Sequence, residues 1–242
     1  MTPSVPKTAV PNTGSSNKEF SETIVGEDAM VRLGQALGRS LFSCGGLGAV
    51  PTEKSIEATP GEENSALVFF EGDLGAGKTT LCRGILQAFG HHGAVKSPTY
   101  TLVESYDAGS DDVENDESSD DELKTAQVHH FDLYRLGDPE ELEYIGIRDY
   151  LEPGNFCLVE WPNRGKGILP TPDLKVKIAV AASELEAEKL ETEELELQAQ
   201  EIQTDGGDVT VGRNVTIVAE TERGEFFLSQ LIKNQVMEEQ GN

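Results

Sequence analysis

Residues 67–80 read Leu67-Val68-Phe69-Phe70-Glu71-Gly72-Asp73-Leu74-Gly75-Ala76-Gly77-Lys78-Thr79-Thr80. An apolar run typical of a buried strand leads directly into G-x-x-x-x-G-K-T, the pattern of the phosphate-binding P-loop. Glycines let such a loop take backbone conformations that a Cβ would forbid, so that successive N–H groups turn inward and form a nest for anions. The stretch therefore predicts a strand, a phosphate-binding loop and a helix in that order.

The residues that follow the glycines have the chemistry that a nucleotide site requires. Lys78 supplies a flexible positive charge for the outer phosphates. The Thr79 hydroxyl stands at the first helical turn, where it can be a ligand of magnesium. Apolar residues recur at helical spacing over residues 80–89, which predicts a helix whose positive N-terminal dipole is directed at the anion.

Acidic residues dominate the composition outside this motif. The chain of 242 residues has a formal net charge of −25 and is 37% hydrophobic. Residues 107–122 contain nine acidic residues and no Lys or Arg, and residues 184–201 contain eight Glu against Lys189 alone. Such segments are typical of solvated insertions, and they repel nucleic acid. Direct RNA or DNA binding needs a local basic patch, for which only 19 Lys and Arg are available.

The domain organisation follows from these shifts in composition. Residues 1–20 are rich in Pro and Ser and predict a flexible leader. Residues 21–242 are expected to form a single P-loop ATPase domain with acidic insertions at about 107–127 and 181–208. No secretory signal or membrane-spanning run is found, and the three cysteines show no C-x-x-C spacing. We expect reduced cysteines, neither a disulfide framework nor a zinc site, and a cytoplasmic protein.

Two further acidic residues end apolar runs and are candidates for the site. Asp132 interrupts residues 128–136, and a carboxylate inside a strand is costly unless it is paired or near a metal, so a functional role is favoured. Glu160 follows four apolar residues, as does the carboxylate of the second magnesium position in P-loop proteins. The neighbours His129 and His130 point to opposite faces of a strand, which favours structural roles over metal binding.

The segment between the P-loop helix and the first acidic insertion reads as a loop running into a strand. It contains Ser97-Pro98-Thr99, and in a P-loop protein this position often carries a switch-like loop. Thr99 or Ser97 can therefore sense the outer phosphate, although ordinary turn chemistry explains the same residues. No obvious arginine finger is present, and Arg83, Arg135 and Arg148 are the candidates.

Four motifs in this order resemble the bacterial TsaE (YjeE) family, the ATPase component of tRNA threonylcarbamoyladenosine synthesis. They are the P-loop at 72–80, the Ser-Pro-Thr segment at 97–103, His130-Phe131-Asp132-Leu133-Tyr134-Arg135-Leu136, and Leu158-Val159-Glu160-Trp161-Pro162. With these elements, the expected fold is α/β: a P-loop NTPase-like three-layer sandwich around a mixed sheet with a parallel core and antiparallel additions. The chain departs from many members at Met30, where they have a Thr near the nucleotide.

The resemblance implies roles for individual residues. Those implied to bind ATP are Gly75, Ala76, Gly77, Lys78, Thr79 and Thr80. Thr79 and Glu160 are implied to hold Mg²⁺, and Asp132 is implied to lie beside the phosphates and to be needed for hydrolysis together with Lys78. The implied partners are TsaB and TsaD, with tRNA contacted only indirectly and no membrane.

These observations favour a slow, partner-stimulated, magnesium-dependent ATPase that resets a TsaB–TsaD complex. The residues alone also allow two other classes of function. A P-loop small-molecule kinase needs an acceptor pocket and usually an arginine-bearing lid, for which an acidic insertion is poorly suited. A nucleotide-dependent binding module uses ATP only to shape a partner surface and needs no turnover.

Overall fold

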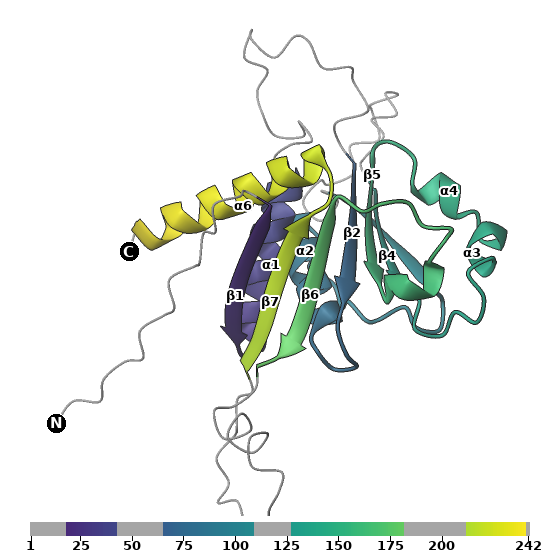
Figure 1. Ribbon diagram of the computed structural model, residues 1–242, viewed down its shortest axis with the longest axis horizontal. Helices are drawn as coiled ribbons and strands as arrows, with labels where there is room; N and C mark the ends of the chain where they lie inside the picture. Colours follow the sequence, from purple (N-terminus) through teal and green to yellow (C-terminus); the bar gives the residue numbers. More distant parts are fainter. Residues whose placement is uncertain (1–17, 43–64, 109–126, 182–211, 241–242) are drawn as a thin grey trace, which may run out of the picture.

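The computed structural model describes residues 18–42, 65–108, 127–181 and 212–240. These residues form one seven-stranded sheet in the order β1-β7-β6-β2-β5-β4-β3 (Figure 1). The strands are β1 (Glu19–Val25), β2 (Ala66–Glu71), β3 (Val103–Asp107), β4 (Gln127–Asp132), β5 (Asn155–Glu160), β6 (Leu174–Val180) and β7 (Gly212–Ala219). The helices are α1 (Glu27–Phe42), α2 (Lys78–Ala88), α3 (Glu141–Tyr144), α4 (Ile147–Tyr150), the 3₁₀ helix η1 (Pro162–Gly165) and α6 (Glu222–Gln240).

The sheet is mixed, with its parallel strands in the centre. β2 pairs in parallel with both β5 and β6, and β5 pairs in parallel with β4. Antiparallel strands complete the sheet, β7 and β1 beyond β6 and β3 beyond β4. The expected α/β fold with a parallel core and antiparallel additions is confirmed.

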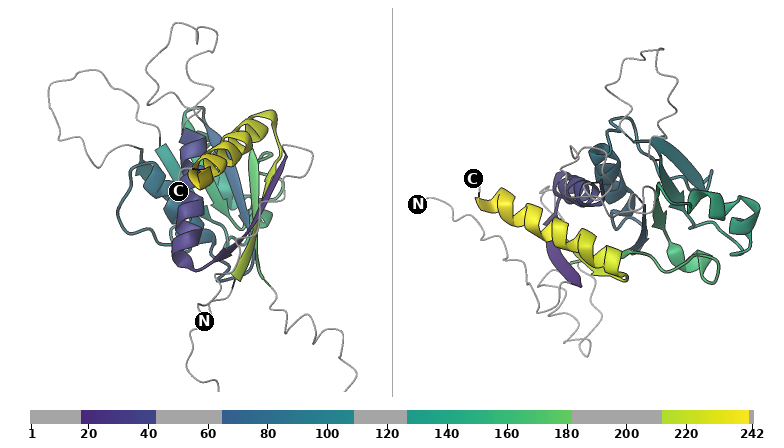
Figure 2. Two further views of the ribbon diagram at one scale, coloured as in Figure 1. Left: turned by 90° about the vertical axis from the view of Figure 1, so that its left-hand side faces the viewer. Right: turned by 90° about the horizontal axis from the view of Figure 1, so that it is seen from above.

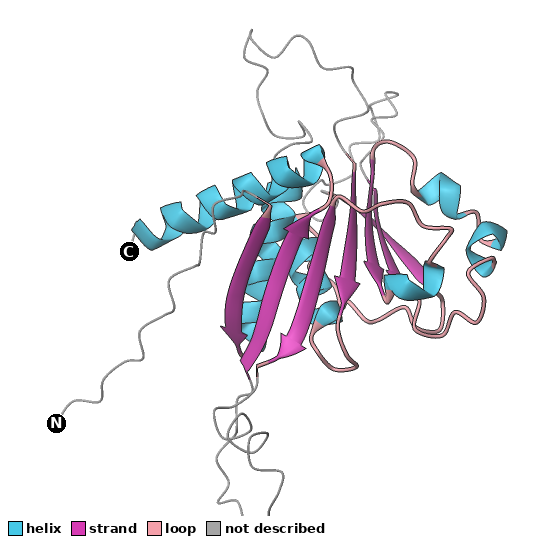
Figure 3. Ribbon diagram, in the orientation of Figure 1, coloured by secondary structure: helices cyan, strands magenta, loops and turns pink. Residues whose placement is uncertain are grey.

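Helices cover the two faces of the sheet unequally. α1 and α2 lie on one face, and α6 crosses the end of the sheet beside α1 (Figures 2 and 3). On the opposite face a smaller apolar cluster joins β2, β5 and β4 to Leu142 of α3 and Ile147 of α4. The three-layer arrangement is therefore complete over β2, β5 and β4. Over β7 only one face is buried, since Val215 and Ile217 are buried while Thr216 between them is partly exposed.

Helices α1 and α2 approach each other unusually closely because glycines face each other at their crossing. A Cβ on Gly34 would lie 2.4 Å from the carbonyl oxygen of Leu81. One on Gly84 would lie 2.3 Å from the carbonyl oxygen of Val31. Real Cβ contacts are longer than this, so the crossing depends on these residues having no side chain. The P-loop helix is thereby held directly against α1.

A buried carboxylate fixes the start of α6 to the centre of the sheet. Asp173, which immediately precedes β6, accepts hydrogen bonds from the backbone N–H of Leu67 at 3.0 Å and from Thr221 Oγ1 at 2.7 Å. Arg223 donates to both oxygens of Asp173, at 3.0 and 2.8 Å. One charged group thus joins β2, β6 and α6.

The structure corrects one boundary and leaves others untested. β1 begins at Glu19, inside the range 1–20 predicted as a leader, because Phe20 and Ile24 alternate with polar residues and pack into the core. Residues 1–17, 109–126 and 182–211 lie outside the described residues, so the leader and the two acidic insertions stay predictions. In the described part of the chain, no helix combines the length and apolar character needed to span a membrane.

Candidate functional site

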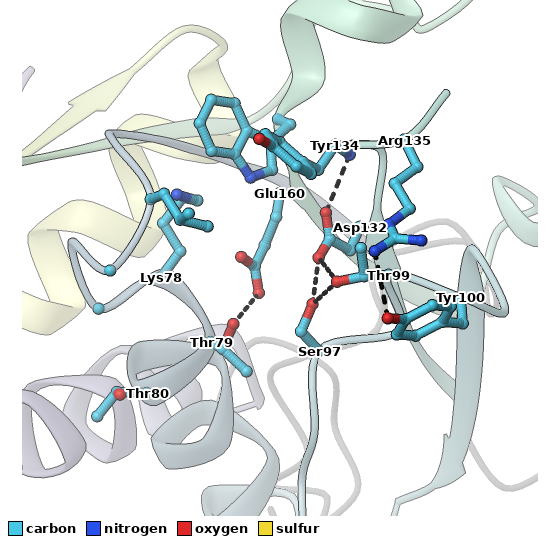
Figure 4. Close-up of a pocket in the computed structure, with 14 residues that line it drawn as sticks. Lys78, Thr79, Thr80, Ser97, Thr99, Tyr100, Asp132, Tyr134, Arg135 and Glu160 are labelled. Carbon is cyan, nitrogen blue, oxygen red and sulfur yellow. Dashed lines mark hydrogen bonds between the residues drawn. The ribbon is translucent and has the colours of Figure 1, made fainter. Parts of the chain in front are cut away.

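The predicted site residues meet at the carboxyl ends of the parallel strands. β2 runs directly into the P-loop, and the register pairs Phe70 with Glu160 and Glu160 with Asp132. A pocket of about 470 Å³ opens at this edge (Figure 4). It is lined by Leu74, Gly75, Gly77, Lys78, Thr79, Thr80, Ser97, Thr99, Tyr100, Asp132, Tyr134, Arg135, Glu160 and Trp161. Motifs separated by about 90 residues of sequence thus share one cavity.

The P-loop has the backbone conformation that its glycines predict. Gly72 has φ +150°, and a Cβ there would lie 2.4 Å from the carbonyl oxygen of Ile178. Gly77 has φ +108° and forms the N-cap of α2. Any residue with a side chain would therefore be strained at either position. Of the loop residues predicted to bind nucleotide, only Ala76 does not line the pocket; it is buried, and its N–H donates to the carbonyl oxygen of Asp73 at 3.1 Å.

Lys78 lies in the pocket with its ammonium group turned back onto the loop. Nζ donates to the carbonyl oxygens of Gly72 at 2.7 Å and Asp73 at 2.8 Å. It also lies 4.2 Å from the centroid of the Trp161 ring, a cation–π contact. Burial lowers the pKa of Lys78, while the carboxylates of Glu160 and Asp132 act in the opposite direction. The ammonium is thus held at the loop by contacts that a phosphate can replace.

Glu160 lies where a magnesium ligand was predicted. Thr79 Oγ1 donates to Glu160 Oε1 at 2.8 Å, and Glu160 is buried. Hydroxyl and carboxylate oxygens are ligands that Mg²⁺ prefers, so the donor atoms fit that ion. His130 Nε2 lies 2.9 Å from the same oxygen, and in the described part of the chain no Lys or Arg forms an ion pair with Glu160. Hydrogen bonds from these neighbours therefore position the carboxylate.

Both oxygens of Asp132 are held in place. Ser97 Oγ and Thr99 Oγ1 donate to Oδ2, the latter at 2.6 Å, and the backbone N–H of Tyr134 donates to Oδ1 at 3.0 Å (Figure 4). The Ser-Pro-Thr loop is therefore tied to Asp132 in this structure. A carboxylate so fixed at the pocket wall can orient a water molecule or accept its proton.

The three candidate arginines differ in position. Arg135 lines the pocket, and its Nη2 donates to the Tyr100 hydroxyl at 3.2 Å while its guanidinium stacks over that ring at 4.2 Å. Arg83 pairs with Glu27 of α1, and Arg148 pairs with Glu143 of α3. Only Arg135 is thus placed to act on a nucleotide in this pocket.

Sequence patterns gave no role at the site to Trp161 or to Arg213. Trp161 packs against the smaller apolar cluster and also lines the pocket over Lys78. Arg213 of β7 lies beneath the loop, with Nη2 3.5 Å from the carbonyl oxygen of Gly75 and Cδ 3.6 Å from the position of a Cβ on Gly77. Met30 Cε lies 3.4 Å from that same position. The position of Trp161 directly after Glu160 was the feature of the sequence that could have placed it at the site. No local feature of the sequence placed Arg213 there.

Comparisons with known proteins show the family of the chain. The family model described as threonylcarbamoyl adenosine biosynthesis protein TsaE matches residues 26–190. A tRNA threonylcarbamoyladenosine biosynthesis protein TsaE from Haemophilus influenzae is 43% identical over 161 residues, covering 66% of this chain and 82% of the relative. The protein of the same name from Bacillus subtilis is 32% identical over 127 residues, covering 52% of this chain and 67% of the relative. A solved structure, that of Bacillus subtilis YdiB, is 20% identical with a TM-score of 0.47, covering 90% of this chain and 97% of that chain. By its family model and these relatives, the chain belongs to the TsaE family.

Proposed function

We propose that this protein binds and hydrolyses ATP in the presence of Mg²⁺ and serves threonylcarbamoyladenosine biosynthesis on tRNA. One observation carries the proposal: Lys78, Thr79, Asp132 and Glu160 converge on one pocket at the phosphate nest. The pathway is supported by the names of the family and of its relatives. Under this proposal the protein is an enzyme that provides the pathway with the free energy of ATP hydrolysis.

Each residue has a defined part in this reaction. The inward N–H groups of the loop and the Lys78 ammonium bind the phosphates, while Thr79 and Glu160 hold the cation. Magnesium would supply positive charge at the phosphate oxygens. Asp132 orients the attacking water, because its carboxylate is fixed by Ser97, Thr99 and the backbone of Tyr134. Hydrolysis then depends on positioning and charge stabilisation.

Our proposal gives this ATPase a slow turnover that partners stimulate. Among the residues that the structure describes, Arg135 is the one arginine in the pocket lining, and it is stacked on Tyr100. A partner that releases or supplements this arginine would therefore accelerate hydrolysis. We propose TsaB and TsaD as these partners, with hydrolysis resetting their complex and with tRNA contacted only indirectly. The strong negative charge of the chain is consistent with indirect contact.

Two substitutions separate nucleotide binding from turnover. Asp132→Asn should lower the rate of phosphate release by about 10²-fold or more, the usual contribution of a positioned acid–base group, while ATP still binds. Lys78→Ala should weaken ATP binding by tenfold or more, since it removes charge-assisted bonds worth about 1.5–3 kcal/mol. Phosphate release without an added acceptor, together with a binding titration, measures both effects.

The outcome also distinguishes the other classes of function. Phosphate release that strictly requires a nucleoside acceptor would indicate a kinase. Full pathway activity of Asp132→Asn in a mixture with TsaB and TsaD would indicate a binding module that needs no turnover. Faster hydrolysis on addition of both partners is the result that our proposal predicts.

A further inference from the structure

A thiol, an imidazole and a carboxylate meet beneath the P-loop helix. Cys82 lies on α2, His130 on β4 and Glu160 on β5, and one potential ligand atom from each lies within 4.8 Å of the other two. All three residues are buried, with exposed fractions of 0%, 0% and 3%. This cluster belongs to neither the phosphate nest nor the Asp132 group.

The arrangement follows from the periodicities of the helix and the strands. Cys82 stands three residues after Thr79 on α2, so both side chains are on the face of the helix that meets the strand ends. His130 and Glu160 both point to the α2 side of the sheet, as do Val128 and Leu158 in the core beneath that helix. Three distant positions in the sequence are thereby brought to one point.

His130 turns its Nε2 toward the point that the three side chains share. Its Nε2 lies 2.9 Å from the Glu160 carboxylate, which can only accept, so Nε2 carries the proton of that hydrogen bond. Its Nδ1 is buried and has no hydrogen-bond partner among the described residues. A neutral imidazole can carry its proton on either nitrogen, so a move of the proton to Nδ1 would leave Nε2 free to bind a metal in place of its hydrogen bond to Glu160.

Charge at this point favours a cation. Two carboxylates, Glu160 and Asp132, are buried at neighbouring register positions, and in the described part of the chain neither forms an ion pair with Lys or Arg. The ammonium of Lys78 attracts both carboxylates, but it supplies one positive charge for two negative ones, and a divalent ion would offset the remaining charge. Thiolate, imidazole and carboxylate are together the ligands of Zn²⁺, whereas Mg²⁺ takes oxygen ligands.

We propose that Cys82, His130 and Glu160 form a zinc-binding site that excludes magnesium from the nucleotide pocket. The two ions compete because each uses Glu160. Zinc reaches the site through the pocket, which Glu160 lines. A water molecule is then its fourth ligand. On binding, the Cys82 thiol gives its proton to solvent as the sulfur–zinc bond forms, and nothing is oxidised. The sequence indicated no zinc site because 48 residues separate Cys82 from His130.

The binding experiment uses Co²⁺ as a spectroscopic substitute for Zn²⁺ on the full, nucleotide-free chain. We expect thiolate-to-cobalt charge-transfer absorption that saturates at one ion per chain and disappears on addition of Zn²⁺. Cys82→Ser should abolish the band. The matched control is Cys157→Ser, a second buried cysteine, on β5, which should keep it. A band that survives Cys82→Ser, or one lost in Cys157→Ser, would overturn the proposal, as would no band in the folded wild type.

The fold of each variant is checked by its thermal unfolding, and Cys82→Ala provides a second substitution that also lacks the thiol. If both variants at Cys82 failed to fold, the wild type would still decide the matter. Excess magnesium nucleotide should then suppress the cobalt band, since Glu160 is shared, and a band insensitive to magnesium nucleotide would contradict the shared ligand.

The exclusion of magnesium has consequences for turnover, and this part rests on the proposed function. Zn²⁺ should inhibit phosphate release, and raising Mg²⁺ should relieve the inhibition. Each variant is compared with its own zinc-free rate, and Cys82→Ser should need at least about tenfold more Zn²⁺ for half inhibition, since even an outer partner of a metal ligand changes affinity by 10- to 100-fold. Equal sensitivity of Cys82→Ser and wild type would contradict the proposal. A cobalt band in a chain that never hydrolyses ATP would preserve the metal site and refute the ATPase function.

Discussion

At the scale of single residues, Lys78 shows how the pocket is prepared for a phosphate. Its ammonium group is bonded to two carbonyl oxygens of its own loop and covered by the Trp161 ring. Burial lowers the pKa of this lysine, and the nearby carboxylates of Glu160 and Asp132 only partly oppose that effect. A triphosphate adds negative charge beside the ammonium, so its arrival should favour the charged form of Lys78.

Arg135 is the residue whose removal should affect turnover without affecting the fold. Arg135→Ala should lower phosphate release by about 10²-fold, the usual loss when one group that stabilises developing charge is removed. Arg148→Ala is the matched control, because that side chain is exposed and paired with Glu143 on the neighbouring short helix. Steady-state phosphate release measures both. Equal rates for the two variants would assign the missing arginine to a partner.

At the scale of elements, the nucleotide site depends on the crossing of α1 and α2. The P-loop continues directly into α2, so the position of that helix sets the position of Lys78 and Thr79. The glycines at the crossing let α1 lie against the backbone of α2. Packing at this crossing therefore helps to hold Lys78 and Thr79 in position in the pocket.

Gly84→Ala should separate these helices and destabilise the protein. The new methyl group would overlap the carbonyl oxygen of Val31, so backbone must move, and overpacking of this kind costs about 1–3 kcal/mol. Chemical denaturation measures the free energy of unfolding. Arg83→Ala, on the same helix, removes only a partly exposed ion pair and should change it by at most about 1 kcal/mol. A Gly84→Ala protein as stable as the wild type would show that the crossing can widen freely.

At the scale of the whole molecule, Asp173 joins the last described helix to the central strands. It bonds to the backbone of β2 and to the first residues of α6, so the antiparallel half of the sheet and the parallel core share one anchor. The apolar side of the same helix, Phe227, Leu228 and Leu231, lies in the main core with α1. The two halves of the sheet are therefore expected to unfold together.

Arg223→Ala tests this anchor. The substitution leaves a buried carboxylate with fewer partners, and losing hydrogen bonds to a charged group costs about 1.5–3 kcal/mol. We expect one cooperative unfolding transition at lower denaturant concentration. Lys175→Ala, which removes a pair whose carboxylate, that of Glu220, is more exposed than Asp173, should cost no more than about 1 kcal/mol. Two separate transitions in the wild type would contradict the single anchor.

Local sequence patterns predicted most of the pocket, and long-range contacts account for what they missed. Lys78, Thr79, Asp132 and Glu160 each stand at the end of a recognisable run, and parallel strands bring such ends together. β1 was missed because its partner β7 lies about 190 residues away in the chain.

The same limit applies to side chains at the site. Trp161 directly follows Glu160 in the sequence, but local spacing does not show that its ring lies over Lys78. The meeting of Cys82 with His130 depends on how α2 lies over the sheet, which spacing in one sequence does not give.

Calorimetric titration of the full chain with magnesium ATP tests the central claim most directly. The account predicts one nucleotide bound per chain, with binding weakened by tenfold or more in Lys78→Ala and retained in Arg148→Ala. A folded wild-type protein that shows no binding, or a Lys78→Ala variant that binds as tightly as the wild type, would contradict it.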